Sequence, residues 1–125
     1  MRGNQPCFVI ALQFFSTMDL INDINRLKEF VAGSKLCLLY IQAPDCGLCS
    51  IMLEKIEALV KRYDCLCSAR AELLVVPEVA GEFLVATAPT VLLFAQGKEI
   101  YRAGTFIDTM ELERVLSKWK EVTID

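Results

Sequence analysis

The apolar positions along the chain switch between helical and strand-like spacing. From Asp19 to Ala32 they recur every three or four residues, which predicts a helix, and Gly33 follows where a left-handed cap would end it. Leu36 to Ile41 is an uninterrupted apolar run, typical of a strand that is covered on both faces of a parallel sheet. From Cys46 or Gly47 onward, apolar residues again share one helical face, so a second helix is predicted there.

The second half of the chain continues the same alternation. Glu72 to Val76 (ELLVV) predicts another buried strand, and Pro77 suits the first turn of a short helix. Two strand-like runs around a Gly-containing turn, Thr90–Ala95 and Glu99–Arg102, predict an antiparallel hairpin. Asp108 then predicts the cap of a last helix. This order implies a mixed α/β sheet with early parallel strands, in which sites gather at the carboxyl ends of strands.

The start of the chain is harder to interpret. The apolar run Cys7–Phe15 predicts a first strand, with a disordered extension as the alternative, so we treat residues 1–18 as an N-terminal segment and 19–125 as one domain. The run is too short to span a bilayer, and we expect no membrane association. A signal peptide, or a natural start at Met18, are further alternatives for this segment.

Composition and charge exclude several classes of function. A chain of 125 residues with 54% hydrophobic residues can build its own core. The net charge of -3 and the lack of a Lys/Arg block argue against nucleic acid as a partner. The chain has no His, which excludes Cys-His pairs, Ser-His-Asp triads and mixed Cys/His zinc sites. Its 6 cysteines need not form a disulfide framework in a domain of this size, so we expect a reducing compartment.

Two cysteines stand where the predicted strand ends and the second helix begins. A thiol at Cys46 would face unpaired N–H groups and the positive helix end, which favour the thiolate, so Cys46 is the predicted nucleophile. Cys49 lies one turn further on and is the predicted resolving thiol. One alternative is a static disulfide. Another is a four-thiolate metal site with Cys65 and Cys67, which a separation of about 20 Å along the helix disfavours.

Several motifs together resemble the thioredoxin family over about residues 19–119. They are Cys46-Gly47-Leu48-Cys49 after a buried strand, Pro77 to Phe83 on the next helix, and Ala88-Pro89-Thr90 opening a strand that is followed by Gly97 and Gly104. The resemblance implies a thioredoxin-like α/β fold with a central mixed sheet of four or five strands flanked by helices. It also implies a cis Pro89 whose loop lies against the dithiol, with Ala88 pairing with an extended substrate peptide. No cofactor and no metal are implied.

Three positions differ from the usual thioredoxin pattern. Asp45 replaces the Trp before the first cysteine, Leu48 replaces the Pro between the cysteines, and Tyr40 replaces a buried acid. We expect Asp45, Gly47 and Leu48 to contact the substrate. An acid at Asp45 disfavours the neighbouring thiolate, so we expect the helix end to lower the pKa of Cys46 less than in the most acidic relatives.

These expectations predict a cytoplasmic thiol-disulfide oxidoreductase that reduces protein disulfides through a mixed disulfide. The predicted partners are protein disulfide substrates and a dithiol reductase that recycles the pair, and we expect a monomer. The alternative is a non-catalytic or redox-sensing module, in which the same fold binds a protein partner through the Pro89 loop and the Asp45 turn.

Overall fold

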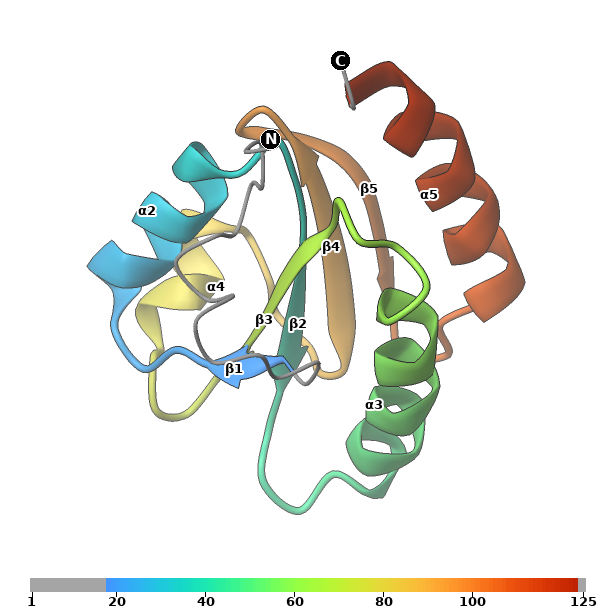
Figure 1. Cartoon of the computed structure of the whole chain (residues 1–125). Coiled ribbons are helices and arrows are strands. Elements are labelled where there is room, and N and C mark those ends of the chain that lie inside the picture. Colours follow the sequence, from blue (N-terminus) through green and yellow to red (C-terminus); the bar gives the residue numbers. More distant parts are fainter. Residues whose placement is uncertain (1–17, 124–125) are drawn as a thin grey trace.

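A computed structural model describes residues 18–123. They form a five-stranded sheet in the order β1-β3-β2-β4-β5, with helices on both faces (Figure 1). Along the chain the elements are β1 (Asp19–Leu20), α2 (Ile24–Gly33), β2 (Leu36–Gln42), α3 (Gly47–Val60), β3 (Cys67–Glu72), α4 (Glu78–Glu82), β4 (Thr90–Ala95), β5 (Lys98–Gly104) and α5 (Thr109–Thr123).

The sheet is mixed, and its strand directions bring several loops to one edge. Strands β1 and β2 both pair with β3 in parallel, whereas β4 is antiparallel to β2 and β5 is antiparallel to β4. The pairing of Ile41 with Thr90 places the beginning of β4 beside the end of β2. The ends of β2, β3 and β5 therefore meet the beginning of β4 at the edge where α3 starts.

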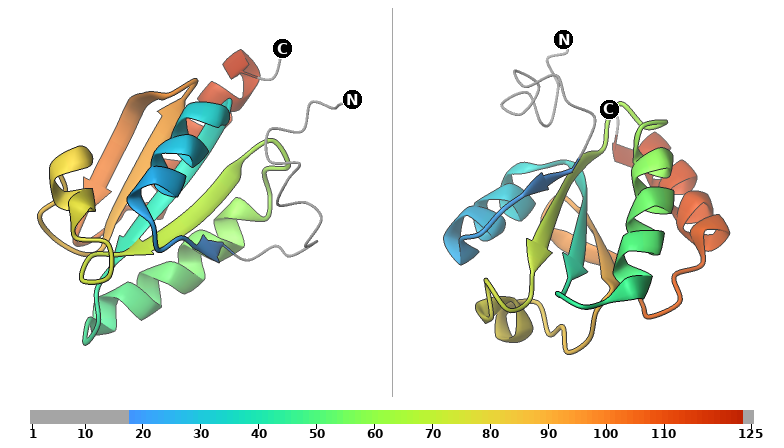
Figure 2. Two further views of the ribbon diagram at one scale, coloured as in Figure 1. Left: turned by 90° about the vertical axis from the view of Figure 1, so that its left-hand side faces the viewer. Right: turned by 90° about the horizontal axis from the view of Figure 1, so that it is seen from below.

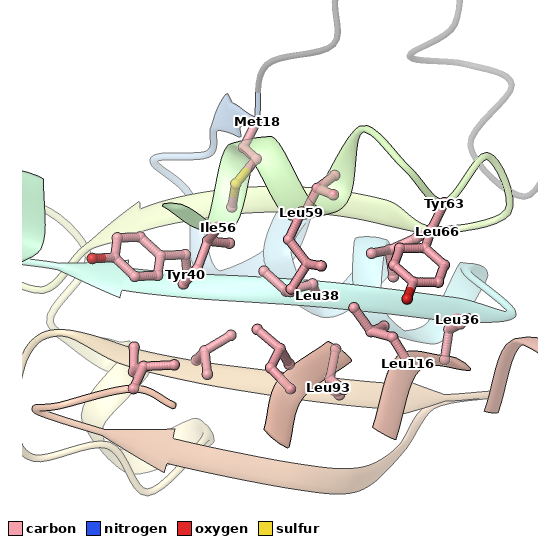
Figure 3. Packing of buried hydrophobic residues seen from close by; sticks show 14 of the residues in the cluster. Met18, Leu36, Leu38, Tyr40, Ile56, Leu59, Tyr63, Leu66, Leu93 and Leu116 are labelled. Atoms are coloured by element: carbon pink, nitrogen blue, oxygen red, sulfur yellow. The ribbon is translucent and has the colours of Figure 1, made fainter. Parts of the chain in front are cut away.

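Strand β2 is buried on both sides. Helices α3 and α5 cover one face of the sheet, and α2 and α4 cover the other (Figures 1 and 2). Side chains of alternate β2 residues point to opposite faces of the sheet and pack into two separate core clusters. Leu36, Leu38 and Tyr40 belong to the cluster with α3 and α5, shown in Figure 3, whereas Cys37 and Leu39 belong to the cluster with α2. This alternation explains why the predicted β2 run is apolar at every position.

The first helix is shorter than its apolar spacing predicts. Asp19 and Leu20 instead pair with β3, and the helix begins at Ile24 because the Asp23 carboxylate caps it, accepting a hydrogen bond from the Asn25 amide at 2.9 Å. The predicted left-handed cap at Gly33 is also wrong. Gly33 is the last helical residue, and the extended Ser34 follows it, donating its hydroxyl to the Phe30 carbonyl at 2.7 Å.

The predicted strand at Glu72–Val76 is wrong as well. The third strand is Cys67–Glu72, in which the small residues Ala69 and Ala71 pack inward and the alternate positions are half-buried. Because small side chains produce little hydrophobic contrast, the pattern of this strand is weak, and the stronger apolar run falls on the turn that follows it. In that turn Leu74 and Val75 are 71% and 52% exposed.

The hairpin and the last helix are confirmed. Gln96 and Gly97 both have positive φ, 52° and 84°, and form a two-residue turn that matches the twist of β4 and β5. The Asp108 carboxylate accepts hydrogen bonds from the amides of Met110 and Glu111 at 3.0 and 3.2 Å, and thereby caps α5.

The predicted first strand at Cys7–Phe15 lies outside the described residues. Met18, the last residue of the N-terminal segment, is 1% exposed and belongs to the core. Within residues 18–123, no helix combines the length and the apolar character that crossing a membrane would require.

The buried thiol of Cys37 makes alkaline stability a test of the core. Burial raises the pKa of Cys37 from 9.0 to about 12, although a hydrogen bond with Ser34 partly offsets this. Between these values the folded chain keeps a proton that the unfolded chain has lost, so the free energy of unfolding falls as pH rises. We expect Cys37→Ala to flatten this fall by up to about 1.4 kcal/mol per pH unit, measured by urea unfolding across the range. An unchanged slope would contradict the buried neutral thiol.

Candidate active site

The dithiol lies at the junction of β2 and α3. After β2 the chain turns through Pro44 and Asp45, and Asp45 is exposed with a positive φ of 56°. This short polar side chain tolerates the left-handed conformation better than most residues. Cys46 then takes the N-cap position, and α3 begins at Gly47.

The two cysteines are linked to each other in three ways. Their sulfur atoms form a disulfide, with the Cα atoms 5.3 Å apart. The Cys49 amide donates a hydrogen bond to the Cys46 Sγ atom at 3.1 Å, and it also lies 3.1 Å from the Cys46 carbonyl oxygen. Cys46 is partly exposed, whereas Cys49 is only 5% exposed. An N-cap sulfur that accepts an amide hydrogen is placed where negative charge on it is stabilised.

The segment before β4 lies at the same edge. The Ala88–Pro89 peptide bond is cis, Pro89 is buried, and Ala88 is partly buried. The Thr90 hydroxyl donates to the Thr87 carbonyl at 2.8 Å, which closes a turn around the proline. Because Thr90 pairs with Ile41, this turn lies beside the strand that leads to Cys46.

The chain after β5 supports the proline from the other side. The Thr105 amide donates to the Pro89 carbonyl at 2.8 Å, with Thr105 at a φ of 63°, an unusual value for a β-branched residue. At Gly104 an added Cβ would approach the Thr90 hydroxyl to 3.4 Å and the Pro89 carbonyl to 3.6 Å. These are ordinary van der Waals distances, so β5 packs against the proline turn with room for a small side chain at Gly104. Phe106 follows directly and is 80% exposed.

A cleft of about 540 Å³ lies beside the dithiol, between the first turns of α3 and the end of β3. Both cysteines line it, as do the charged residues Asp45, Arg70 and Glu72. Arg70 is held in place by hydrogen bonds from its guanidinium to the Met18 carbonyl at 3.0 Å and to the Gln42 side chain at 3.4 Å. The cysteines thus border a polar, solvent-facing space.

The thiols of Cys37 and Cys65 are poor nucleophiles, and Cys67 is disulfide-bonded. Burial raises the pKa of Cys37 to about 12 and also raises the pKa of Cys65. Both are free, Cys37 in β2 and Cys65 after α3. Over the described part of the chain, no three His, Cys, Asp or Glu side chains are grouped as metal ligands.

The comparisons with known proteins agree with this geometry. A thioredoxin family model matches residues 20–118. The chain belongs to the thioredoxin family. Among curated relatives, a thioredoxin-like protein YdfQ of Bacillus subtilis is 28% identical over 98 residues, covering 78% of this chain and 88% of its own. Thioredoxin H2 of Arabidopsis thaliana is 32% identical over 109 residues, covering 86% and 78%.

Solved structures show the same fold. Thioredoxin NaTrxh of Nicotiana alata has a TM-score of 0.73 and 30% identity, covering 81% of this chain and 90% of its own. A mutant thioredoxin from Halobacterium salinarum has a TM-score of 0.76 at 19% identity, covering 84% and 92%. With its Cys46–Cys49 pair, this thioredoxin-family protein is a thiol-disulfide oxidoreductase.

The predicted site residues of this thioredoxin-family protein divide into those that lie in loops at the edge of the sheet and one, Leu48, that packs against the core. The proline turn with Ala88 and Pro89 lies beside the end of β2, where the dithiol loop begins, and Asp45 and Gly47 are exposed in that loop. Leu48 is partly buried and packs against the core, so little of its side chain faces solvent.

Sequence reasoning missed the supports of this site. The hydrogen bond from Thr105 to the proline turn and the exposure of Phe106 follow from backbone conformation, which no periodicity encodes. Arg102 anchors the segment before this turn. It stands in a strand that the hairpin pattern predicts, but the Phe83 and Leu84 carbonyls that it binds are 19 and 18 residues away in the sequence.

Arg102 is expected to hold the segment that leads to the proline. Its guanidinium donates to the carbonyls of Phe83 and Leu84 at 2.7 Å each, and it pairs with Glu99. Arg102→Met keeps the stem but loses these bonds, so we expect about 1 kcal/mol lower unfolding free energy and faster proteolysis at residues 83–88. Arg114→Met, which removes an exposed pair with Glu111, is the control and should change neither. Equal effects of the two variants would contradict this role.

Proposed function

We propose that this protein reduces disulfides of other proteins, with Cys46 as the nucleophile and Cys49 as the resolving thiol. The observation that carries the proposal is the N-cap placement of Cys46, whose Sγ accepts the Cys49 amide hydrogen at 3.1 Å. The difference in exposure supports the assignment of roles, because an incoming disulfide can reach Cys46 more easily than the buried Cys49.

The proposed cycle has two exchange steps. The Cys46 thiolate attacks one sulfur of the substrate disulfide, forming a mixed disulfide and releasing the first substrate thiolate. Cys49 then loses its proton to solvent, and its thiolate attacks the Cys46 sulfur. The Cys46–Cys49 disulfide forms, the mixed disulfide breaks, and the second substrate thiolate leaves. The substrate gains two electrons, and the protein is oxidised to the state that the structure describes.

The surroundings of the dithiol favour a protein as the substrate. Exposed apolar side chains lie on two loops at the edge of the sheet where α3 begins: Leu74 and Val75 follow β3, and Phe106 follows β5. A protein substrate can bury apolar groups of this kind on either side of the end of β2. In this proposal the Ala88 backbone pairs with an extended segment of the substrate, while Asp45, Gly47 and the small exposed part of Leu48 contact it from the dithiol loop.

We further propose that the protein acts as a monomer in the reducing cytoplasm, where a separate dithiol reductase regenerates it. The partly exposed Cys65 has a free thiol, which suits a compartment in which accessible thiols stay reduced, although Cys67 is disulfide-bonded in the structure.

A redox titration with matched cysteine variants tests the proposed roles. In dithiol and glutathione buffers, the wild-type pair should undergo one reversible two-electron transition near the roughly -270 mV of thioredoxin. Cys46→Ser should abolish disulfide reduction. Cys49→Ser should instead accumulate a mixed disulfide on Cys46, detected by mass spectrometry, because the resolving step is lost.

Two results would contradict the proposal. A transition near roughly -120 mV would indicate an oxidant rather than a reductase. If wild-type protein reduces no protein disulfide, yet Cys46→Ser still binds the same partners, the chain is a binding module instead.

Asp45 offers a test of electrostatics at the nucleophile. Its exposed carboxylate directly precedes Cys46 and disfavours negative charge on that sulfur. We expect Asp45→Asn to speed alkylation of Cys46 in the reduced protein about threefold at low ionic strength, and less at high salt. Asp64→Asn, an exposed acid beyond the far end of α3, is the control. A rate increase that salt does not diminish would argue against a charge effect.

A further inference from the structure

Tyr40 connects the buried core to the dithiol. It is the last β2 residue in the cluster under α3 and α5, and it is 0% exposed. In Figure 3 its ring lies along β2 beside Ile56, with the hydroxyl pointing away from the rest of the cluster. That hydroxyl donates a hydrogen bond to the main-chain carbonyl of Cys49 at 2.7 Å.

The Cys49 backbone therefore has a partner on each side. Its carbonyl accepts the Tyr40 hydroxyl, and its amide donates to the Cys46 Sγ atom at 3.1 Å. The phenol holds the residue whose amide stabilises charge on the nucleophile and whose own sulfur must reach the mixed disulfide. A shift of the first turn of α3 away from β2 would therefore disturb both the attack by Cys46 and the later attack by Cys49 on the mixed disulfide.

We infer that Tyr40 is a positioning residue for the disulfide exchange, which anchors Cys49 to the sheet through its carbonyl and so sets the rate of the resolving step. This inference rests on the proposed roles of Cys46 and Cys49. In this chain the neutral phenol of Tyr40 stands at the position where the thioredoxin pattern has a buried acid.

The chemistry of the phenol restricts what it can do. Burial raises the pKa of Tyr40 to about 12, so the hydroxyl stays protonated wherever thiol exchange proceeds. Its single proton is directed at the Cys49 carbonyl, and it does not take the proton from the Cys49 thiol. That proton leaves through the solvent-facing cleft, where Asp45, Arg70 and Glu72 are the charged residues of the lining.

Tyr40→Phe isolates this hydrogen bond, because the ring still fills the core and only the hydroxyl is lost. The chain offers a matched control in Tyr63→Phe. Tyr63 is buried in the same cluster at 8% exposure, lies at the opposite end of Figure 3, and has its hydroxyl 3.0 Å from the Ser117 hydroxyl. Each variant loses one hydrogen-bonded hydroxyl from the same cluster, but of these two residues only Tyr40 contacts the dithiol.

The experiment follows the reaction of the fully reduced full-length protein with a chromogenic aromatic disulfide, dithiobis(nitrobenzoate). Attack by Cys46 releases the first coloured thiolate, and attack by Cys49 on the mixed disulfide releases the second. The Cys49→Ser protein provides the baseline, since its Cys46 adduct cannot be resolved. For Tyr40→Phe we expect the second release to slow about fivefold, because losing a hydrogen bond of about 1 kcal/mol raises the barrier of that step by a similar amount. Tyr63→Phe should match wild type in both releases.

Each outcome has a distinct meaning. If wild-type protein gives no second release beyond the Cys49→Ser baseline, the proposed roles of the cysteines fail. If wild type gives both releases and Tyr40→Phe matches it, or Tyr63→Phe slows equally, the positioning role of Tyr40 is overturned. A slowed second release in Tyr40→Phe alone, at equal loss of stability in the two variants, supports it.

Discussion

The register of β2 is the constraint on which the rest of the site depends. All residues from Leu36 to Ile41 are 0% exposed, and the strand is paired on both sides, with β3 and with β4. A slip of one residue would move every side chain to the opposite face of the sheet. Tyr40 would then leave the layer beneath α3, and the turn carrying Cys46 would begin at a different height above the core. Burial on both faces makes such a slip costly.

From this strand the site is assembled out of segments that are distant in the sequence. The pairing of Ile41 with Thr90 brings the proline turn beside the end of β2, and the Thr105 amide ties that turn to the chain after β5. Thr105 tolerates a left-handed conformation that costs a β-branched residue on the order of 1–3 kcal/mol. Strain of this kind persists where the surrounding structure over-determines the backbone, and here the end of β5 and the hydrogen bond to the Pro89 carbonyl fix Thr105.

The electrostatics of the site separate into a neutral interior and a charged surface. Beneath the dithiol, the Tyr40 phenol contributes a hydrogen-bond donor without a charge. The charged groups Asp45, Arg70 and Glu72 instead line a cleft that water can enter. Charges in contact with solvent are screened by salt, whereas the buried hydrogen bond is not. The dithiol thus has a buried hydrogen bond on its core side, which salt does not screen, and charged side chains on its solvent side, whose effect salt weakens.

The sequence by itself determined the parts of this protein that one residue pattern encodes locally. The apolar run of β2, the turn at Gln96 and Gly97, and the Asp108 cap each combine a hydrophobic period with a residue of known turn or cap chemistry. The position of Cys46 and Cys49 at a strand-to-helix junction follows from the same local signals. The inward residues of β3 are small, so the hydrophobic pattern of this strand is weak, and the sequence predicts a strand on the turn that follows it instead.

Only the tertiary structure decided which of these residues act on one another. The bond from Tyr40 to Cys49, the support of Pro89 by Thr105, and the anchoring of Leu84 by Arg102 join elements through space. The two β1 residues were likewise drawn into the sheet by β3, against the helical period of the sequence around them. Hydrogen bonds between distant segments depend on sheet register and layer packing, and no periodicity along the chain carries that information.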